Sequence, residues 1–164
     1  MCSRLLLLLL LLCAGTAAHA QTAQATLRPM GSSGVTGTVQ FTAFEAGTRV
    51  VALVRGLGPG YHGLHVHTGP DCSAPSLIHG DDQALHGSPH NRPPYRRAGD
   101  LGNLYARDGM ARYDHIDPVL RLDGPLAAVG RVVVVHAKRD DLNTQPDGNA
   151  GEVIACGVLE ATSL

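Results

Sequence analysis

The chain has 164 residues and a net charge of −1, from 13 Lys and Arg against 14 Asp and Glu. This length fits one domain, and the balanced charge argues against sequence-independent nucleic-acid binding, which needs an excess of basic residues. The 20 glycines and the 4% aromatic content favour a compact β fold with many turns over a helical bundle. Nine histidines stand out, and histidine is the commonest protein metal ligand, so the composition points to metal binding.

Residues 1–20 have the pattern of a secretory signal peptide. Arg4 supplies the positive start, residues 5–12 form an unbroken apolar run, and the small residue Ala20 ends the segment. The apolar run is too short to span a bilayer, and no later stretch is long enough for a membrane span. We therefore expect a mature domain of residues 21–164 that is exported, to a periplasm or to the medium.

Alternating or continuous apolar residues predict short strands along the mature chain. The clearest predicted strands are 37–44, 48–54, 61–67, 104–106, 110–113, 131–136 and 152–159. Residues 21–33 are expected to be a loose lead-in, and 68–103 and 140–151 to be two long loops. Because no stretch has sustained helical periodicity, the sequence predicts about eight strands in an antiparallel β-sandwich or barrel.

Two cysteines, Cys72 and Cys156, remain after removal of the predicted signal peptide. In an oxidising compartment an isolated pair indicates one disulfide. Two free thiols, or two thiolate metal ligands, are the alternatives.

The histidines form a pattern that suits a metal site. His65 and His67 lie two apart on a predicted strand, so both rings point to one face. Other candidate ligands are distant in sequence: His79, His86 and His90 in the first long loop, Asp100 after them, and His136 at the end of a valine-rich strand. Imidazoles with one carboxylate suit zinc, copper, nickel or iron.

Several segments together resemble the copper/zinc superoxide dismutase family. They are Gly-Leu-His-Val-His-Thr-Gly-Pro-Asp-Cys at 63–72, Gly-Asp-Leu-Gly-Asn at 99–103, Val-Val-His-Ala-Lys-Arg-Asp-Asp-Leu at 134–142, Gly-Asn-Ala-Gly at 148–151 and Ala-Cys-Gly-Val at 155–158. They occur in the family's order, and the resemblance covers about residues 25–160. It implies an eight-stranded antiparallel Greek-key β-barrel with a sandwich-like core and two long functional loops.

The resemblance also implies the roles of individual residues. The implied copper ligands, which are also the catalytic residues, are His65, His67, His79 and His136. The implied zinc ligands are His86, Asp100 and His79, the last bridging both metals. Asp140 matches the carboxylate that links a copper histidine to a zinc histidine, and Cys72 and Cys156 match the family disulfide. The implied substrate is superoxide, and a homodimer is compatible with the family.

Three departures from the family pattern modify these expectations. Arg97 stands where a further zinc histidine is expected, and an arginine cannot bind zinc because it stays protonated. His90 is a candidate replacement, with a solvated loop histidine as the alternative. The spacing from His79 to His86 is one residue short, and Val153 occupies the place of the arginine that attracts superoxide.

We therefore expect an exported superoxide dismutase with reduced activity. A copper-binding or copper-buffering protein on a dismutase scaffold is the alternative from a different functional class. A dismutase that has lost zinc is a third interpretation, suggested by Arg97.

Overall fold

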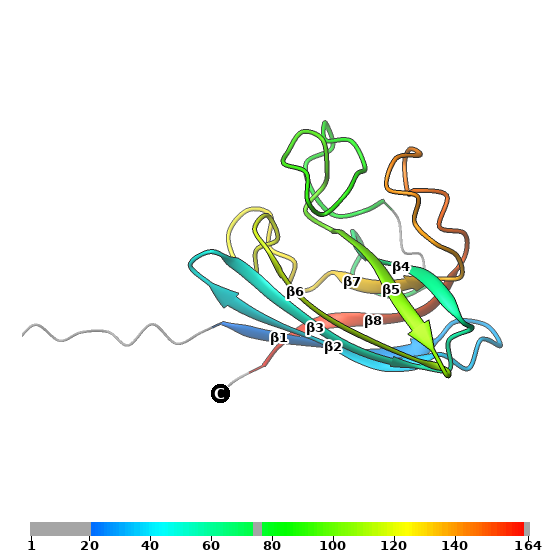
Figure 1. Cartoon of the computed structure of the whole chain (residues 1–164). Helices are drawn as coiled ribbons and strands as arrows, with labels where there is room; N and C mark the ends of the chain where they lie inside the picture. The colour runs from blue at the N-terminus through cyan, green and yellow to red at the C-terminus, as the bar shows by residue number, and fades with distance from the viewer. Residues whose placement is uncertain (1–20, 74–76, 163–164) are drawn as a thin grey trace, which may run out of the picture.

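The strands pair around a closed circuit in the computed structural model, which describes residues 21–73 and 77–162 (Figure 1). The predicted signal peptide lies outside the described residues. The strands are β1 (Thr22–Pro29), β2 (Thr36–Phe44), β3 (Gly47–Arg55), β4 (Gly60–His67), β5 (Asp100–Arg107), β6 (Met110–Asp117), β7 (Val132–His136) and β8 (Val153–Thr162). Every pairing is antiparallel. Residues 21–73 and 77–162 contain no helix, so none is present there to cross a membrane.

The order of the strands around the barrel is β1-β2-β3-β6-β5-β4-β7-β8, with β8 returning to β1. Strand β3 pairs with β6 rather than with β4, and β4 pairs with β7. The connections from β3 to β4 and from β6 to β7 therefore each join two strands that are not neighbours in the barrel. This is Greek-key connectivity. The expected eight-stranded Greek-key barrel is confirmed.

The prediction of a loose lead-in at residues 21–33 was wrong, because residues 22–29 form β1. Ala23, Ala25 and Leu27 are buried and alternate with more exposed polar residues, which is the period of a half-buried strand. Two of the three inward residues are alanines, so the alternation in hydrophobicity was too weak to find.

The boundaries of β5 and β6 also differ from the prediction. Strand β5 begins at Asp100, so the first long loop ends at residue 99 rather than 103. Strand β6 extends to Asp117 and includes His115, which lies beyond the predicted strand of residues 110–113. Both strands therefore carry polar side chains into the region beneath the loop.

The barrel interior is filled by aliphatic side chains and one phenylalanine. The core includes Phe41, Val50, Leu64, Leu104 and Leu159, each fully buried. Residues 77–99 of the long loop and the segment 137–152 lie on the same side of the barrel (Figure 1). Gln145 joins them, since its side chain exchanges hydrogen bonds with the main-chain N–H and C=O of His86 at 2.8 and 2.9 Å.

Cys72 and Cys156 form the expected disulfide across 84 residues of sequence. Cys72 belongs to the long loop, while Cys156 is a buried residue of β8. The bond therefore fastens the start of the loop to the barrel.

The long loop is also held at its end by a buried ion pair. Arg96 is completely buried, and its Nη2 donates to Asp117 Oδ2 at 2.8 Å. The same guanidinium donates to the carbonyl oxygens of Pro89, Arg97 and Ala98. Asp117 Oδ1 accepts the N–H groups of two residues after β6, so one carboxylate joins the loop to the strand end.

Removal of the disulfide is expected to lower the free energy of unfolding. A Cys72→Ser/Cys156→Ser double variant should lose on the order of 4 kcal/mol, because the cross-link restricts the unfolded chain across a long loop. Urea unfolding of the variant and of the oxidised wild-type protein measures this loss. The reduced wild-type protein is the control, and its stability should match that of the variant. Equal stability of the oxidised and cysteine-free proteins would contradict it.

Replacing Arg96 with methionine is expected to lower the free energy of unfolding by about 3–5 kcal/mol, because the buried Asp117 carboxylate loses its charged partner. Arg49→Met is the matched control, since Arg49 forms an ion pair with Asp114 in which both side chains are about half exposed. The control should change stability little, because water screens that pair. Thermal or urea unfolding compares the two, and similar losses would show that burial of the Arg96 pair is unimportant.

Candidate metal centre

Strands β4 and β7 present different residues on their two faces. Leu64 and Val66 of β4 point into the barrel core, as does Val135 of β7. His65 and His67 alternate with the core residues, so they face away from the core. Val134 of β7 lies opposite His65 in register, and the residue two further along β7 is His136, so the three histidines share one face.

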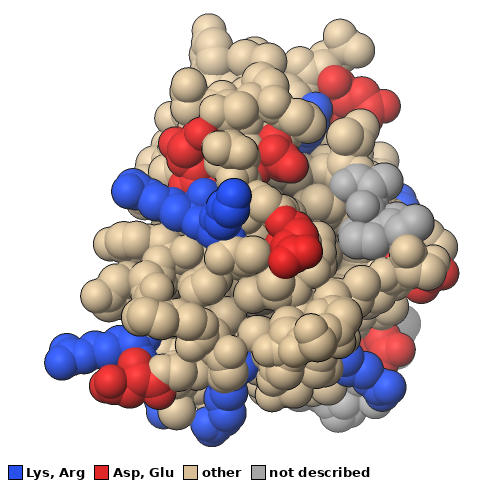
Figure 2. Space-filling view, turned by 90° about the vertical axis from the view of Figure 1, so that its right-hand side faces the viewer, with Lys and Arg blue, Asp and Glu red and all other residues tan. Residues whose placement is uncertain are grey.

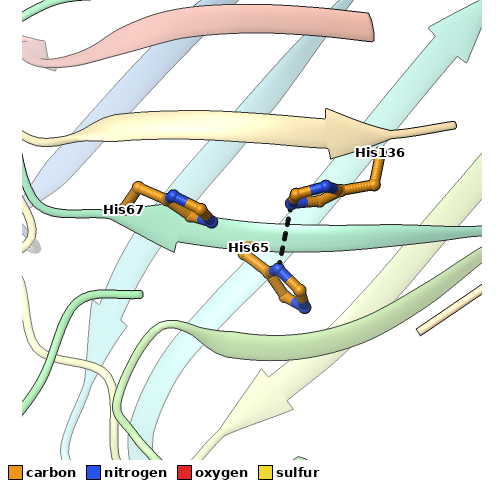
Figure 3. A group of neighbouring side chains, drawn as sticks. All are labelled: His65, His67 and His136. Atoms are coloured by element: carbon orange, nitrogen blue, oxygen red, sulfur yellow. Dashed lines mark hydrogen bonds between the residues drawn. The ribbon is translucent and has the colours of Figure 1, made fainter. Parts of the chain in front are cut away.

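The rings of His65, His67 and His136 converge on this face (Figure 3). Their side chains offer ligand atoms within 4.8 Å of one another, and all three residues are buried. His65 Nδ1 and His136 Nε2 lie 3.2 Å apart. Two nitrogen ligands bound to one metal ion at bond lengths of about 2.0 Å lie roughly 3.3 Å apart, so this spacing fits a shared ion.

In each histidine ring, the nitrogen that donates a hydrogen bond carries the proton, so the opposite nitrogen is the one available to a metal. His136 Nδ1 must donate to the carbonyl oxygen of Gly151, at 2.8 Å, because a carbonyl only accepts. Burial, and to a smaller extent nearby His65, lowers the pKa of His136 to about 4. The ring is therefore neutral at neutral pH, with an unprotonated Nε2, and this is the form that binds metal.

Asp140 links the histidine triad to a second group of ligands. Its Oδ2 accepts from His65 Nε2 at 2.8 Å, and its Oδ1 accepts from His86 Nε2 at 2.9 Å. Burial alone would raise the pKa of Asp140, but the hydrogen bonds from His65 and His86 hold it well below its usual range. The carboxylate therefore stays ionised and fixes the orientation of both rings.

The second group consists of His65, His86 and Asp100, whose ligand atoms also lie within 4.8 Å of one another. His86 Nδ1 lies 2.7 Å from Asp100 Oδ1. Burial opposes protonation of His86, but hydrogen bonds to Asp100 and Asp140 outweigh it and raise the pKa to about 9. Without metal the ring is thus a cation between two carboxylates, and a metal that binds Nδ1 must displace its proton. The imidazole–carboxylate donor pair suits zinc.

Two of the predicted ligands, His79 and His90, lie outside both groups of ligands. His79 is buried, but its Nε2 donates to the carbonyl oxygen of Leu126 at 3.0 Å, and it belongs to neither group of ligands found among the described residues. Burial lowers its pKa, and the charge of Arg131 adds to the effect. His90 belongs to neither group and packs against His115, with ring centroids 5.8 Å apart.

Three residues to which the sequence gives no supporting role, Asn103, Arg97 and Gln145, help to hold the centre in place. Asn103 holds the backbone of Asp140, since its Nδ2 donates to the Asp140 carbonyl and its Oδ1 accepts the Asp140 N–H. Arg97 takes no ligand position, but its main-chain N–H donates to Asp100 Oδ2 at 2.7 Å. Gln145 clamps the backbone of His86 from 59 residues away, and no local sequence signal marks such a contact.

Gly148 provides the space that the Asp140 carboxylate occupies. A Cβ atom at this position would overlap Asp140 Oδ1 and lie 2.7 Å from His86 Nε2, and its φ of +67° favours glycine. The main-chain N–H of Asp141 also donates to the Gly148 carbonyl at 2.9 Å. Gly148 therefore allows the second long loop to close over the link between the two ligand groups.

Gly148→Ala is expected to displace Asp140 and to weaken copper binding by about tenfold or more, because His65 loses its orienting partner. Gly124→Ala is the matched control, since Gly124 has a φ of +77° and nothing lies within 4 Å of an added Cβ. Both variants carry backbone strain of about 1 kcal/mol, but only the first has the steric overlap. Competition titrations with a copper chelator measure the affinities, and equal affinities for the two variants would contradict the role of Gly148.

Comparison with protein-family models gives a match to Copper/zinc superoxide dismutase (SODC) over residues 35–159. This match covers most of the chain and includes every strand except β1 and the last residues of β8. The family implies copper and zinc as cofactors, and the two groups of buried ligands have the donor types that these metals use. The barrel, the disulfide and the histidine clusters agree with the match, and the chain belongs to the copper/zinc superoxide dismutase family.

Proposed function

We propose that this protein is an exported superoxide dismutase in which His65, His67 and His136 hold copper while His86 and Asp100 contribute to zinc binding. The observation that supports it most strongly is the convergence of three buried imidazoles, with His65 Nδ1 and His136 Nε2 only 3.2 Å apart. His79 can join either metal only if its Nε2 gives up the hydrogen bond to Leu126.

Bound copper would supply the one-electron acceptor and donor by which two superoxide anions and two protons become dioxygen and hydrogen peroxide. The protein's own residues provide a fixed site for that chemistry. Asp140 orients His65, the Gly151 carbonyl orients His136, and the barrel core beneath β4 and β7 keeps the rings from spreading. Rings held before metal binding cost less reorganisation when charge moves through the site.

Two features of the chain support export. The sequence of residues 1–20 has the pattern of a signal peptide. The structure also contains a disulfide between Cys72 and Cys156, and such bonds persist in oxidising compartments.

We further propose that Val153 lowers the rate at which superoxide reaches the centre. Val153 pairs with His136 in the β7–β8 register, so the residue in the arginine's place lies next to a metal ligand. Valine offers no charge to attract an anion. Figure 2 shows basic and acidic side chains interspersed on the face that it presents, and no broad basic field covers that face.

Val153→Arg is expected to raise the second-order rate of superoxide dismutation at low salt severalfold, with the gain shrinking as salt screens the added charge. Thr38→Arg is the matched control, because it adds the same charge at an exposed position of β2, four strands around the barrel from β4. Direct superoxide decay kinetics measure both rates, and an equal gain in the control would contradict a local effect at Val153.

The same kinetics test the proposed activity. The wild-type protein loaded with copper and zinc should accelerate superoxide decay in a copper-dependent manner, while the metal-free protein should not. Full copper occupancy without acceleration would contradict the dismutase proposal and favour the copper-buffering alternative, which the same three imidazoles would serve.

A further inference from the structure

A surface hollow that borders Asn103, one of the residues that support the metal centre, is lined by two histidines that this function does not use. It has a volume of about 340 Å³ and lies between β5, β6, the long loop and the segment after β7. His90 comes from the long loop and is exposed, and His115 comes from β6 and is half-buried. Neither histidine belongs to the two groups of metal ligands that contain His65, His86 and His136.

The two rings lie at a separation that allows both to bind one metal ion. Their centroids are 5.8 Å apart. In the histidine triad of the metal centre, the centroid separations are 4.9, 5.5 and 5.8 Å. Rings bound to one ion through nitrogens at bond lengths of about 2.0 Å have centroids roughly 5–6 Å apart, so the surface pair falls in the same range.

Three of the other polar side chains that line the hollow have partners of their own. The Tyr113 hydroxyl donates to the Leu101 carbonyl at 2.7 Å. Both carboxylate oxygens of Asp114 accept from Arg49. Arg139 lies over the ring of Tyr61, with its Cζ 5.2 Å from the centroid. Because Arg49 occupies both carboxylate oxygens of Asp114, the two imidazoles are the metal-binding side chains that this hollow offers.

We propose that His90 and His115 form a separate surface site for a late transition-metal dication, with water completing the coordination. Cu²⁺ is expected to bind more tightly than Zn²⁺ or Ni²⁺, following the general order for nitrogen ligands. A metal bound here joins the long loop to β6, and the same loop carries His86. The site stands apart from the dismutase proposal, because it uses none of the residues of the metal centre.

The experiment uses the protein with copper and zinc already bound and free metal removed. Equilibrium dialysis against Cu²⁺ should show one further copper ion per chain. His90→Gln and His115→Gln should each weaken binding of this ion by about tenfold or more, because either change leaves a single imidazole. The double variant should lose less binding free energy than the sum of the two single losses, since the two rings act as one chelating pair.

Arg139→Gln is the matched control, because it lines the same hollow and removes a positive charge without removing a metal ligand. Its affinity for the further copper ion should be unchanged or higher. The proposal would be overturned if the wild-type protein bound no further copper, or if either histidine variant retained wild-type affinity. Circular dichroism of each variant shows whether the barrel is intact, and both histidines lie at the surface, where substitution leaves the core unchanged.

Discussion

The two-sided hydrogen bonding of Asp140 is the interaction on which the metal centre depends. One carboxylate oxygen binds His65 and the other binds His86, while Asn103 of β5 holds the main chain of Asp140. One side chain of the second long loop thereby connects a strand of the barrel with the first long loop. The position of each ligand group is therefore linked to that of the other.

The barrel explains why so small a chain can hold this arrangement. Leu64 and Val66 fill the core from β4, and the alternating positions of the same strand carry His65 and His67. Strand β7 repeats this division, with Val133 and Val135 in the core and His136 at its end. The packing that stabilises the fold therefore also holds the ligands in position. A substitution that disrupts the core is expected to displace the metal ligands as well.

Much of the fold and part of the site could be predicted from the sequence. Alternation marked β2, the run of four valines marked β7, and the pattern His65-Val66-His67 placed two ligands on one face. Strand β1 was missed because its inward residues are small. Contacts made by Gln145 and Arg96 depend on how distant loops meet, which no local pattern records. His79 and His90 lie in the long loop, where sequence position does not determine the direction of a side chain, and the structure gives them Leu126 and His115 as neighbours.

A crystal structure of the copper- and zinc-loaded protein, with anomalous scattering measured at both metal edges, would show which residues hold each metal. We expect a copper peak bonded to His65 Nδ1, His67 and His136 Nε2, and a zinc peak at His86 Nδ1 and Asp100. Asp140 should still accept from the outer nitrogens of His65 and His86. A copper peak away from the three histidines, or an Asp140 that contacts neither ring, would contradict the central claim.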